Sequence, residues 1–450
     1  MRDSSSTDIR EFIDLNPFSR YQALVIGLCV VAVVVEGFDV QAMGYVAPVV
    51  SRELHIARAA LGPVLSSSLL GMMFGALALG PLGDRVGRKP IIVVSVLLVA
   101  LGSSLTAAAD SVRALIAFRL LTGFGLGGSL PNLIALNSEY TPKRLRATAI
   151  VIAGSGFSIG ATLGGFASAG LLGRYGWRSI FVLGGVLPGV VAIVLIALLP
   201  ESIRFLVMKA GQAERVARIL SKIAPRATIS PATMFFAEKG TARGFTVRQL
   251  FANGRARLTV ALWAMFFLNL LDLYFLNNWL PTVIHDAGIA LEKAIIITAL
   301  FQAGGTVGAL WLGWRIDRAL SYRILAWAYV AASACVFLIG AAGTSVVLLA
   351  CSVFASGVCV VGGQTGANAL AAECYPTALR STGVGWSLGI GRIGSIIGPL
   401  MGGALLPAQG GAMRAFTVAA ALILIAGIAA FLASGAHVEA SKSVAAGADS

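Results

Sequence analysis

Long apolar segments alternate with short polar segments along the whole chain. A helix needs about 20 apolar residues to cross the hydrocarbon core of a bilayer. Each segment must be helical, because lipid cannot satisfy exposed backbone groups. The pattern predicts six helical spans, a polar stretch and six further spans, at residues 22–48, 59–82, 90–109, 113–137, 147–173, 178–199, 258–284, 294–314, 324–343, 345–371, 381–405 and 412–435.

The composition supports an all-α membrane protein, because 57% of the 450 residues are hydrophobic and only 12% are charged. Ordinary soluble domains do not have this composition. Within the polar stretch, "AERVARILSKIAP" has helical periodicity and predicts an amphipathic helix that would lie on the membrane surface. We expect five parts, namely a tail (1–21), a six-helix bundle (22–199), a linker (200–257), a second six-helix bundle (258–435) and a second tail (436–450).

The distribution of positive charge predicts the topology. Of the 34 Lys and Arg residues, 25 lie in segments on the side of the two termini, seven on the opposite side and two within spans. Cytoplasmic segments carry the excess of positive charge, so both termini are expected in the cytoplasm of a multi-pass inner (plasma) membrane protein. The net charge of +14 then reflects topology and contact with anionic lipid, not nucleic-acid binding. The polar N-terminal tail lacks the order of a signal peptide, so the first span is expected to be retained.

The two halves of the chain repeat each other. Glu36 and Asp39 align with Asn269 and Asp272 at an offset of 233 residues. The loop "GPLGDR" aligns with "GWRIDR" at the same offset, and "EYTPKRLR" aligns with "ECYPTALR" at 234. Six spans therefore repeat six spans in parallel, which is how alternating-access transporters with a central site are often built.

Two carboxylates, Glu36 and Asp39, lie inside the first span at positions i and i+3, so they share one helix face. A charge at such a depth costs about 3 kcal/mol on insertion scales, and such residues usually have a function. We interpret them as proton-coupling groups, with Asp272 of the repeat as a third. The alternative is a structural ion pair. Arg119 lies at a similar depth in span four, and we expect it to pair with Asp39 or to share a water-filled path with it.

The second arginine within a span, Arg392, lies near the membrane midplane, and the repeat places the uncharged Ser158 opposite it. A planar guanidinium suits a substrate carboxylate. Alternatively, Arg392 only neutralises Glu36. With Arg119, it is our candidate substrate-binding cation. Other candidates are polar or aromatic side chains of the spans, which either orient a substrate or join helices: Gln41, Asn132, Asn137, Tyr274, Asn277, Asn278, Gln364, Asn368 and Trp386. For Trp279, near an outer helix end, we favour a position at the membrane interface.

Several classes of protein are disfavoured by the sequence. The run "GFGLGG" follows no strand and opens no nucleotide-binding unit, so it is interpreted as a helix-packing surface. The five cysteines and three histidines have no metal-ligand or catalytic spacing. We expect no enzyme activity, no metal and no cofactor, and an ion gradient as the energy source.

The loop "GPLGDRVGRKP" resembles the loop signature of the major facilitator superfamily, and a degenerate copy follows span eight. Within that superfamily, "EGFDVQAMG", "FRLLTGFGLGGSLPNLIALNSEY", "NNWLP" and "GVGWSLGIGRIGSIIGP" resemble the aromatic acid:proton symporters. Glu36 stands where many carriers of benzoates have Asp, and in this it is similar to the hydroxyphenylpropionate type.

The resemblance implies a gate on the cytoplasmic side. In the first half it would comprise Asp84, Arg85, Arg88 and Lys89, in contact with Glu139 and the start of span eleven. The corresponding residues of the second half are Asp317, Arg318, Glu373 and Arg380. A carboxylate such as Asp84 would be stabilised by facing a helix N-terminus.

We therefore expect a monomeric, proton-coupled importer of small aromatic carboxylic acids of the hydroxybenzoate or hydroxyphenylpropionate class. The alternatives are transport of other organic anions or of sugars, and export by the same fold. A receptor or a channel is a further alternative from another class. The expected partners are the aromatic acid, protons and the lipid bilayer.

Overall fold

The computed structural model describes residues 6–209, 211–225, 234–236, 247–252, 255–319, 323–375, 379–408 and 410–448. Side chains are described within these ranges except at 6, 7, 147, 234–236, 317–319, 381 and 435–448.

Twelve helices of the described part are long and apolar enough to cross a membrane, which confirms the predicted fold class. Most of them extend a few residues beyond the predicted spans. Their bounds are α2 (Arg20–Glu53), α3 (Arg58–Val86), α4 (Arg88–Ala107), α5 (Val112–Tyr140), α6 (Lys143–Tyr175), α7 (Arg178–Leu198), α11 (Ala256–Asp286), α12 (Leu291–Ala319), α13 (Arg323–Ala341), α14 (Val346–Cys374), α15 (Arg380–Leu405) and α16 (Gly411–Ala448).

Local sequence signals fix where the helices begin and end. Ser19 and Gln22 form a reciprocal capping box at the start of α2, in which each side chain accepts a hydrogen bond from the other residue's backbone N–H. Between α3 and α4 the chain turns within the single residue Gly87, whose φ is 116°. Only glycine adopts this conformation readily, so the short "VGR" connection depends on it.

The same pairs of helices pack against each other in both halves. Gly71 of α3 lies against the carbonyl of Leu120 in α5, and Gly304 of α12 lies against the carbonyl of Phe354 in α14. These contacts keep the offsets of 233 and 234 residues found in the sequence. Small residues let helix backbones approach closely, so the glycines set the packing. The parallel repeat is therefore present in the structure.

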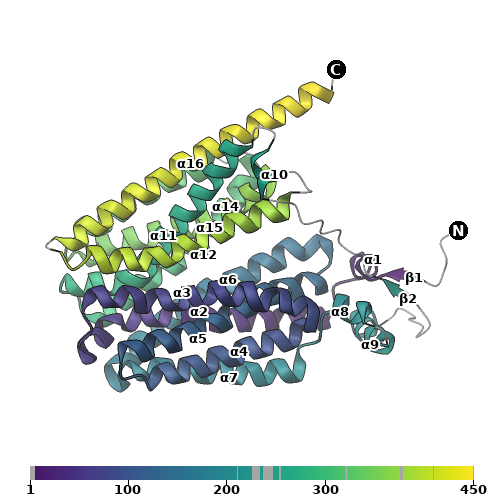
Figure 1. Ribbon diagram of the computed structural model, residues 1–450, viewed down its shortest axis with the longest axis horizontal. Coiled ribbons are helices and arrows are strands. Elements are labelled where there is room, and N and C mark those ends of the chain that lie inside the picture. The colour runs from purple at the N-terminus through teal and green to yellow at the C-terminus, as the bar shows by residue number, and fades with distance from the viewer. Residues whose placement is uncertain are drawn as a thin grey trace.

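Figure 1 shows two bundles, α2–α7 and α11–α16, with both chain termini at one end of the molecule. We call this end the terminal face and the opposite end the far face. Toward the far face the bundles touch, since Gly62 of α3 faces Gly403 of α15 and the Ser66 hydroxyl donates to the Ile396 carbonyl over 2.8 Å. Toward the terminal face the bundles diverge (Figure 1).

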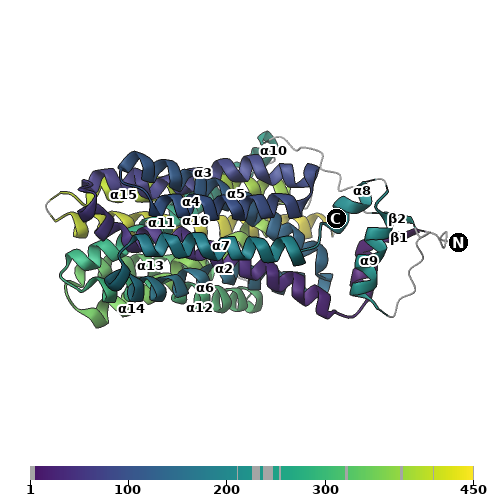
Figure 2. The same cartoon turned by 90° about the horizontal axis from the view of Figure 1, so that it is seen from below.

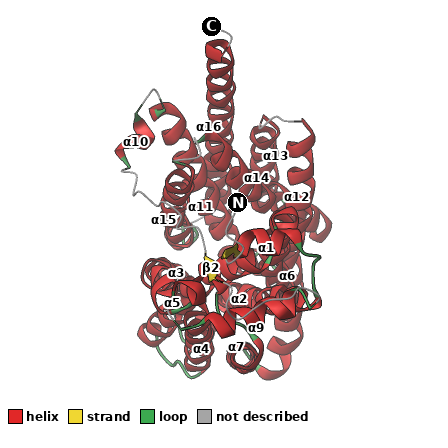
Figure 3. Ribbon diagram, turned by 90° about the vertical axis from the view of Figure 1, so that its right-hand side faces the viewer, coloured by secondary structure: helices red, strands yellow, loops and turns green. Residues whose placement is uncertain are grey.

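Shorter elements gather at the terminal face: α1 (Ile9–Leu15), α8 (Ile203–Met208), α9 (Ala213–Ile223), α10 (Arg248–Phe251) and the parallel strands β1 (Ser6–Asp8) and β2 (Met234–Phe236). Figure 2 shows α9 lying across the end of the first bundle, and Figure 3 shows α1 and α9 over that bundle with α10 beside the second. The predicted amphipathic helix is thus present as α9.

The apolar face of α9 is covered by protein, not by membrane as we expected. Val216, Leu220 and Ile223 are buried in one cluster with Ile9 and Ile13 of α1. An amphipathic pattern predicts an apolar face that must be buried, and here residues of α1, α2 and α8 share the cluster that buries it.

Candidate functional site

The buried ion pair between Asp39 of α2 and Arg119 of α5 is the central polar contact of the first bundle. Arg119 Nη1 lies 3.0 Å from Asp39 Oδ2, and its Nη2 donates to the Asp39 carbonyl over 3.0 Å. The Ser103 hydroxyl of α4 donates to the other carboxylate oxygen over 2.8 Å. Both charged side chains are 0% exposed. The expected pairing is therefore found, and its charges cancel inside the bundle.

Glu36 lies one turn before Asp39 and has a different environment. Its side chain is buried, and Oε1 accepts a hydrogen bond from the Ser129 hydroxyl of α5. Within the described part of the chain no cation pairs with it. A buried carboxylate without a cation is costly as an anion, so this site suits a protonated carboxyl.

Asp272 occupies on α11 the place that Asp39 occupies on α2, but without its partners. By the repeat, the position of Arg119 is taken on α14 by Val353, which is fully buried. Asp272 is 0% exposed, and among the described residues neither carboxyl oxygen has a hydrogen-bond partner. The second bundle thus buries a carboxyl group that no neighbouring donor or cation stabilises as an anion.

Arg392 lies where the contact between the bundles ends. It is on the same face of α15 as Ile396, one turn away, whose carbonyl accepts from Ser66 of the other bundle. Toward the terminal face, Gly389 and Gly385 lie on the same face of α15. A Cβ atom added at either glycine would have no other atom within 4 Å, so this part of the face is open. Arg392 is partly buried and has no ion-pair partner among the described residues. Its guanidinium is therefore available to an anion between the bundles.

Several predicted polar residues connect α11 to its neighbours near the far face. The Gln41 amide of α2 donates to the Asn277 carbonyl over 2.7 Å, and the Gln302 amide of α12 donates to Asn277 Oδ1 over 2.9 Å. Asn278 donates to the carbonyl of Tyr274 in its own helix. Gln41 therefore joins the two bundles directly.

A second set of amides links α11 to α14. Asn269 Nδ2 donates to Gln364 Oε1 over 2.6 Å, and Gln364 Nε2 donates to Asn368 Oδ1 over 3.3 Å. Asn368 is exposed, whereas Asn269 is fully buried. The three amides form a polar track from the interior of the second bundle to its surface.

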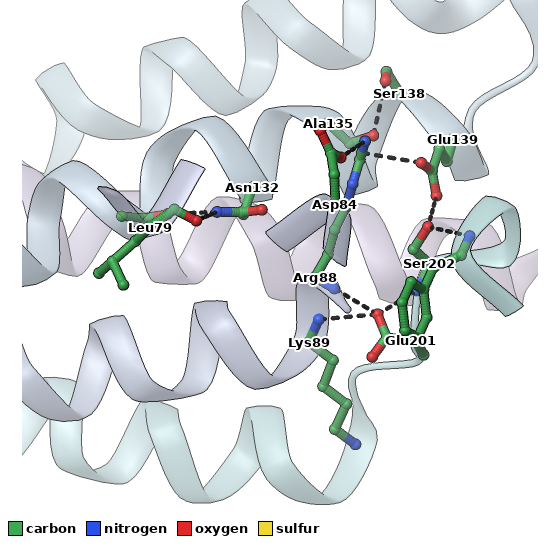
Figure 4. Close-up of polar contacts among 12 residues, drawn as sticks. Leu79, Asp84, Arg88, Lys89, Asn132, Ala135, Ser138, Glu139, Glu201 and Ser202 are labelled. Atoms are coloured by element: carbon green, nitrogen blue, oxygen red, sulfur yellow. Dashed lines mark hydrogen bonds and ion pairs between the residues drawn. The ribbon is translucent and has the colours of Figure 1, made fainter. Parts of the chain in front are cut away.

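Asn132 and Asn137 join helices, which is the alternative that the sequence left open for such residues. The Asn132 amide donates to the carbonyls of Gly128 and Leu79, tying α5 to α3 (Figure 4). The Asn137 amide donates to the carbonyl of Ala149 in α6.

Trp279 and Trp386 both contact other residues of the protein. Trp279 is fully buried, and its ring N–H donates to the Pro399 carbonyl of α15 over 2.9 Å, so the predicted interface position is wrong. Hydropathy alone does not tell which face of a span carries a tryptophan. Trp386 stacks on Trp263 of α11 with ring centroids 5.8 Å apart.

Three of the predicted gate residues of the first half, Asp84, Arg88 and Glu139, form a network at the terminal face (Figure 4). Arg88 Nη1 lies 3.0 Å from Glu139 Oε1, and its Nη2 lies 3.3 Å from Asp84 Oδ1. The Ser202 hydroxyl, at the start of α8, donates to Glu139 Oε2 over 2.6 Å. The expected contact between the loop and Glu139 is thus present.

The carboxylate at the N-terminus of α4 is Glu201, not Asp84. Glu201 Oε1 accepts from the backbone N–H groups of Arg88 and Lys89, over 2.7 and 3.1 Å (Figure 4). The side chain of Asp84 is 71% exposed. Asp84 lies near the end of α3, four residues before Arg88, the first residue of α4. Its carboxylate therefore reaches the Arg88 side chain rather than the N-terminus of α4.

The expected contact between this loop and the start of span eleven is absent from the described part, because the bundles diverge at the terminal face. Arg85, Glu373 and Arg380 are exposed and have no ion-pair partner among the described residues. The side chains of Asp317 and Arg318 lie outside the described residues.

Sequence reasoning missed several contacts. Ser129 and Ser103 bind the buried carboxylates, but single hydroxyls in a helix give no distinct signal. Glu201 lies in the run "PES" (residues 200–202), and nothing in the sequence indicates that it contacts the start of α4. At the far face, Arg58 lies 2.9 Å from Asp286 and Arg52 Nη2 lies 2.6 Å from His285 Nε2, so both pairs join the far-face ends of the two bundles.

Comparison with known proteins agrees with this architecture. A family model described as Major Facilitator Superfamily matches residues 29–353 and 262–448. The chain is 42% identical to the 4-hydroxybenzoate transporter PcaK of Pseudomonas aeruginosa over 89% of each chain. It is 41% identical to a gallate transporter of Pseudomonas putida, covering 93% of this chain and 94% of the relative. It is 34% identical to the 3-(3-hydroxy-phenyl)propionate transporter of Escherichia coli, covering 91% and 93%.

Solved structures share the fold at low sequence identity. The inward open xylose transporter XylE of Escherichia coli superimposes with a TM-score of 0.71 at 15% identity, covering 90% of this chain and 95% of that one. The nucleoside transporter NupG gives a TM-score of 0.69 at 16% identity, covering 92% and 99%.

Neutralising Asp39 tests whether the buried pair holds the first bundle together. Asp39→Asn leaves the Arg119 guanidinium buried without a counter-charge, which typically costs about 3–5 kcal/mol. We expect a lower thermal midpoint in detergent and less monodisperse protein. The double variant Asp39→Asn/Arg119→Gln should recover part of the stability, because no charge is left unpaired. Asp110→Asn, which removes a carboxylate that is 84% exposed, is the control. Melting of Asp39→Asn at the wild-type temperature would contradict this role.

Proposed function

The chain belongs to the Major Facilitator Superfamily and to its aromatic acid transporters, and we propose that it imports small aromatic carboxylic acids together with protons by alternating access. The family is one of transporters, not enzymes, and the twelve apolar helices make the chain a multi-pass membrane protein. Within the family, the partly buried Arg392, which pairs with no described residue, supports the substrate class.

Arg392 is the observation that carries the substrate proposal. It is a partly buried cation that no described residue pairs with, and it lies where the two bundles part. The relatives are named for 4-hydroxybenzoate, gallate and hydroxyphenylpropionate, each of which joins a carboxylate to a hydroxylated ring. A guanidinium binds a carboxylate in a bidentate manner. The exposed amide of Asn368 and the partly buried amide of Gln364 would then meet the hydroxyl groups of the ring.

Glu36 and Asp272 support proton coupling. Both are buried without a cationic partner in the described part, whereas Asp39 is already paired with Arg119. Burial without a counter-charge favours the neutral carboxyl over the anion. We therefore assign proton carriage to Glu36 and Asp272, and a fixed role to the Asp39–Arg119 pair. Entry of one anion with one proton would be electroneutral, and a second proton would let the membrane potential drive uptake.

We place the terminal face in the cytoplasm, on the basis of the excess of positive charge there. The contacts at the far face would then close the outer entrance. The divergence of the bundles at the terminal face would open the site to the cytoplasm, where an imported acid is released.

Uptake by proteoliposomes tests the function. With the purified protein, we expect saturable accumulation of labelled 4-hydroxybenzoate or 3-(3-hydroxyphenyl)propionate when the outside is acidic, and its loss with a protonophore. Xylose serves as the control substrate. Setting the pH gradient and the membrane potential separately gives the proton number. Efflux against the gradient, or uptake unaffected by the protonophore, would contradict proton-coupled import.

Arg392→Lys tests the carboxylate site. Lysine keeps the charge but loses the planar fork, so substrate affinity should fall at least about tenfold while protein abundance is preserved. Arg113→Lys, at an exposed position at the start of α5, is the matched control. Equilibrium binding of a labelled aromatic acid is the measurement, and unchanged affinity would remove Arg392 from the site.

Glu36→Gln and Asp272→Asn test the proton carriers. Each amide has the shape of the protonated carboxyl, so both variants should fold normally. We expect loss of uphill, pH-driven uptake but retention of counterflow, in which labelled substrate exchanges for unlabelled substrate without a proton gradient. Asp110→Asn controls for loss of a carboxylate elsewhere. Normal pH-driven accumulation by both variants would show that these carboxyls do not carry the proton.

A further inference from the structure

A cavity of about 500 Å³ lies at the terminal face of the first bundle, apart from the space between the bundles. Residues at the end of α3, the start of α4, the segment after α7, and α8 and α9 line it. Its walls are apolar at Val86, Leu199, Phe205 and Ile219. In Figure 2, α8 and α9 lie next to the ends of α4 and α7, which run side by side.

The charged residues of the cavity are mostly basic. Lys89, Lys209, Arg215 and Arg218 line it together with one acidic residue, Glu201. Glu201 already accepts from the N-terminal N–H groups of α4. Arg215 and Arg218 are exposed on α9 and have no ion-pair partner among the described residues. The cavity therefore carries an excess of positive charge, and its two arginines are available to an anion.

The apolar surface beside the cavity indicates that this anion carries hydrocarbon chains. On α7, Val190 is 53% and Ile193 is 68% exposed, and on α4 Val94 and Leu97 are similarly exposed. Such residues on a spanning helix face lipid. On α7 this exposed surface continues to Leu198, which is 51% exposed and adjoins Leu199 of the cavity wall. There the Lys89 ammonium donates to the Ile196 carbonyl over 2.7 Å. A ligand with its polar group in the cavity could thus place hydrocarbon chains along the exposed apolar surface of α4 and α7.

We propose that this cavity binds the phosphate head group of an anionic phospholipid, with its acyl chains along α4 and α7. Basic pockets between transmembrane helices are suited to such head groups. A free phosphate ion would use the cations but not the apolar surface. The bound lipid would tie α8 and α9 to the first bundle. This site is separate from the proposed transport site, so it stands or falls independently.

Lipid binding to the full-length protein tests the proposal. The protein is placed in phosphatidylcholine nanodiscs with increasing phosphatidylglycerol, and the retained lipid is counted by native mass spectrometry, with the thermal midpoint as a second readout. We expect preferential retention of phosphatidylglycerol by the wild type. Arg215→Ala/Arg218→Ala should weaken it by about fivefold per cation removed. Both side chains are exposed, so the variant should fold.

The control is Arg257→Ala, which removes an exposed cation at the start of α11, in the second bundle. It should keep the preference for phosphatidylglycerol. Equal retention of phosphatidylcholine and phosphatidylglycerol by the wild type would overturn the proposal, as would identical behaviour of the double variant and the control. Equal stabilisation by inorganic phosphate or glycerol 3-phosphate in detergent would identify a site for soluble anions and would also overturn it.

Discussion

Asp39 and Arg119 lie where no water can solvate them, so each charge depends on the other. Their contact fixes α2 against α5, and the Ser103 hydroxyl adds α4 to the same point. Both Nη groups of Arg119 are taken up by this contact, one with the carboxylate and one with the carbonyl of Asp39. Glu36, one turn away, therefore cannot draw on them and has only the Ser129 hydroxyl. In our proposal, the buried pair thus leaves Glu36 as the carboxyl of the first bundle that exchanges a proton.

The repeat preserves backbone packing and changes the chemistry. Glycines hold α3 to α5 and α12 to α14 in the same way, because a close helix approach needs a small residue in either half. The charged positions differ between the halves. Asp272 corresponds to Asp39, but the position that corresponds to Arg119 holds no cation, and Arg392 stands where the first half has Ser158. Among the described residues, the second bundle therefore holds a carboxyl group and a guanidinium that have no ion-pair partner. Proton and substrate binding in our proposal both rest on this asymmetry.

The sequence predicted features that depend on periodicity and depth. Twelve spans, the repeat and the pairing of Asp39 with Arg119 all follow from helix length and from the cost of burying charge. Features that depend on which face or segment meets another were not predictable. The path of the chain after α7 brings Glu201, not Asp84, to the start of α4. Likewise, the periodicity of α9 predicts an apolar face but does not show that this face packs with residues of α1, α2 and α8.

The strength of the contacts differs within and between the bundles, and alternating access needs this difference. Between the bundles at the far face, Arg58 and Asp286 form an ion pair whose side chains are 47% and 31% exposed. Exposed pairs typically contribute only about 0–1 kcal/mol, so thermal motion can break them. Within the first bundle the fully buried Asp39–Arg119 pair resists separation. Each bundle can therefore move as a body while the far-face contacts open and close, and in our proposal Arg392 binds the substrate where the two bodies separate.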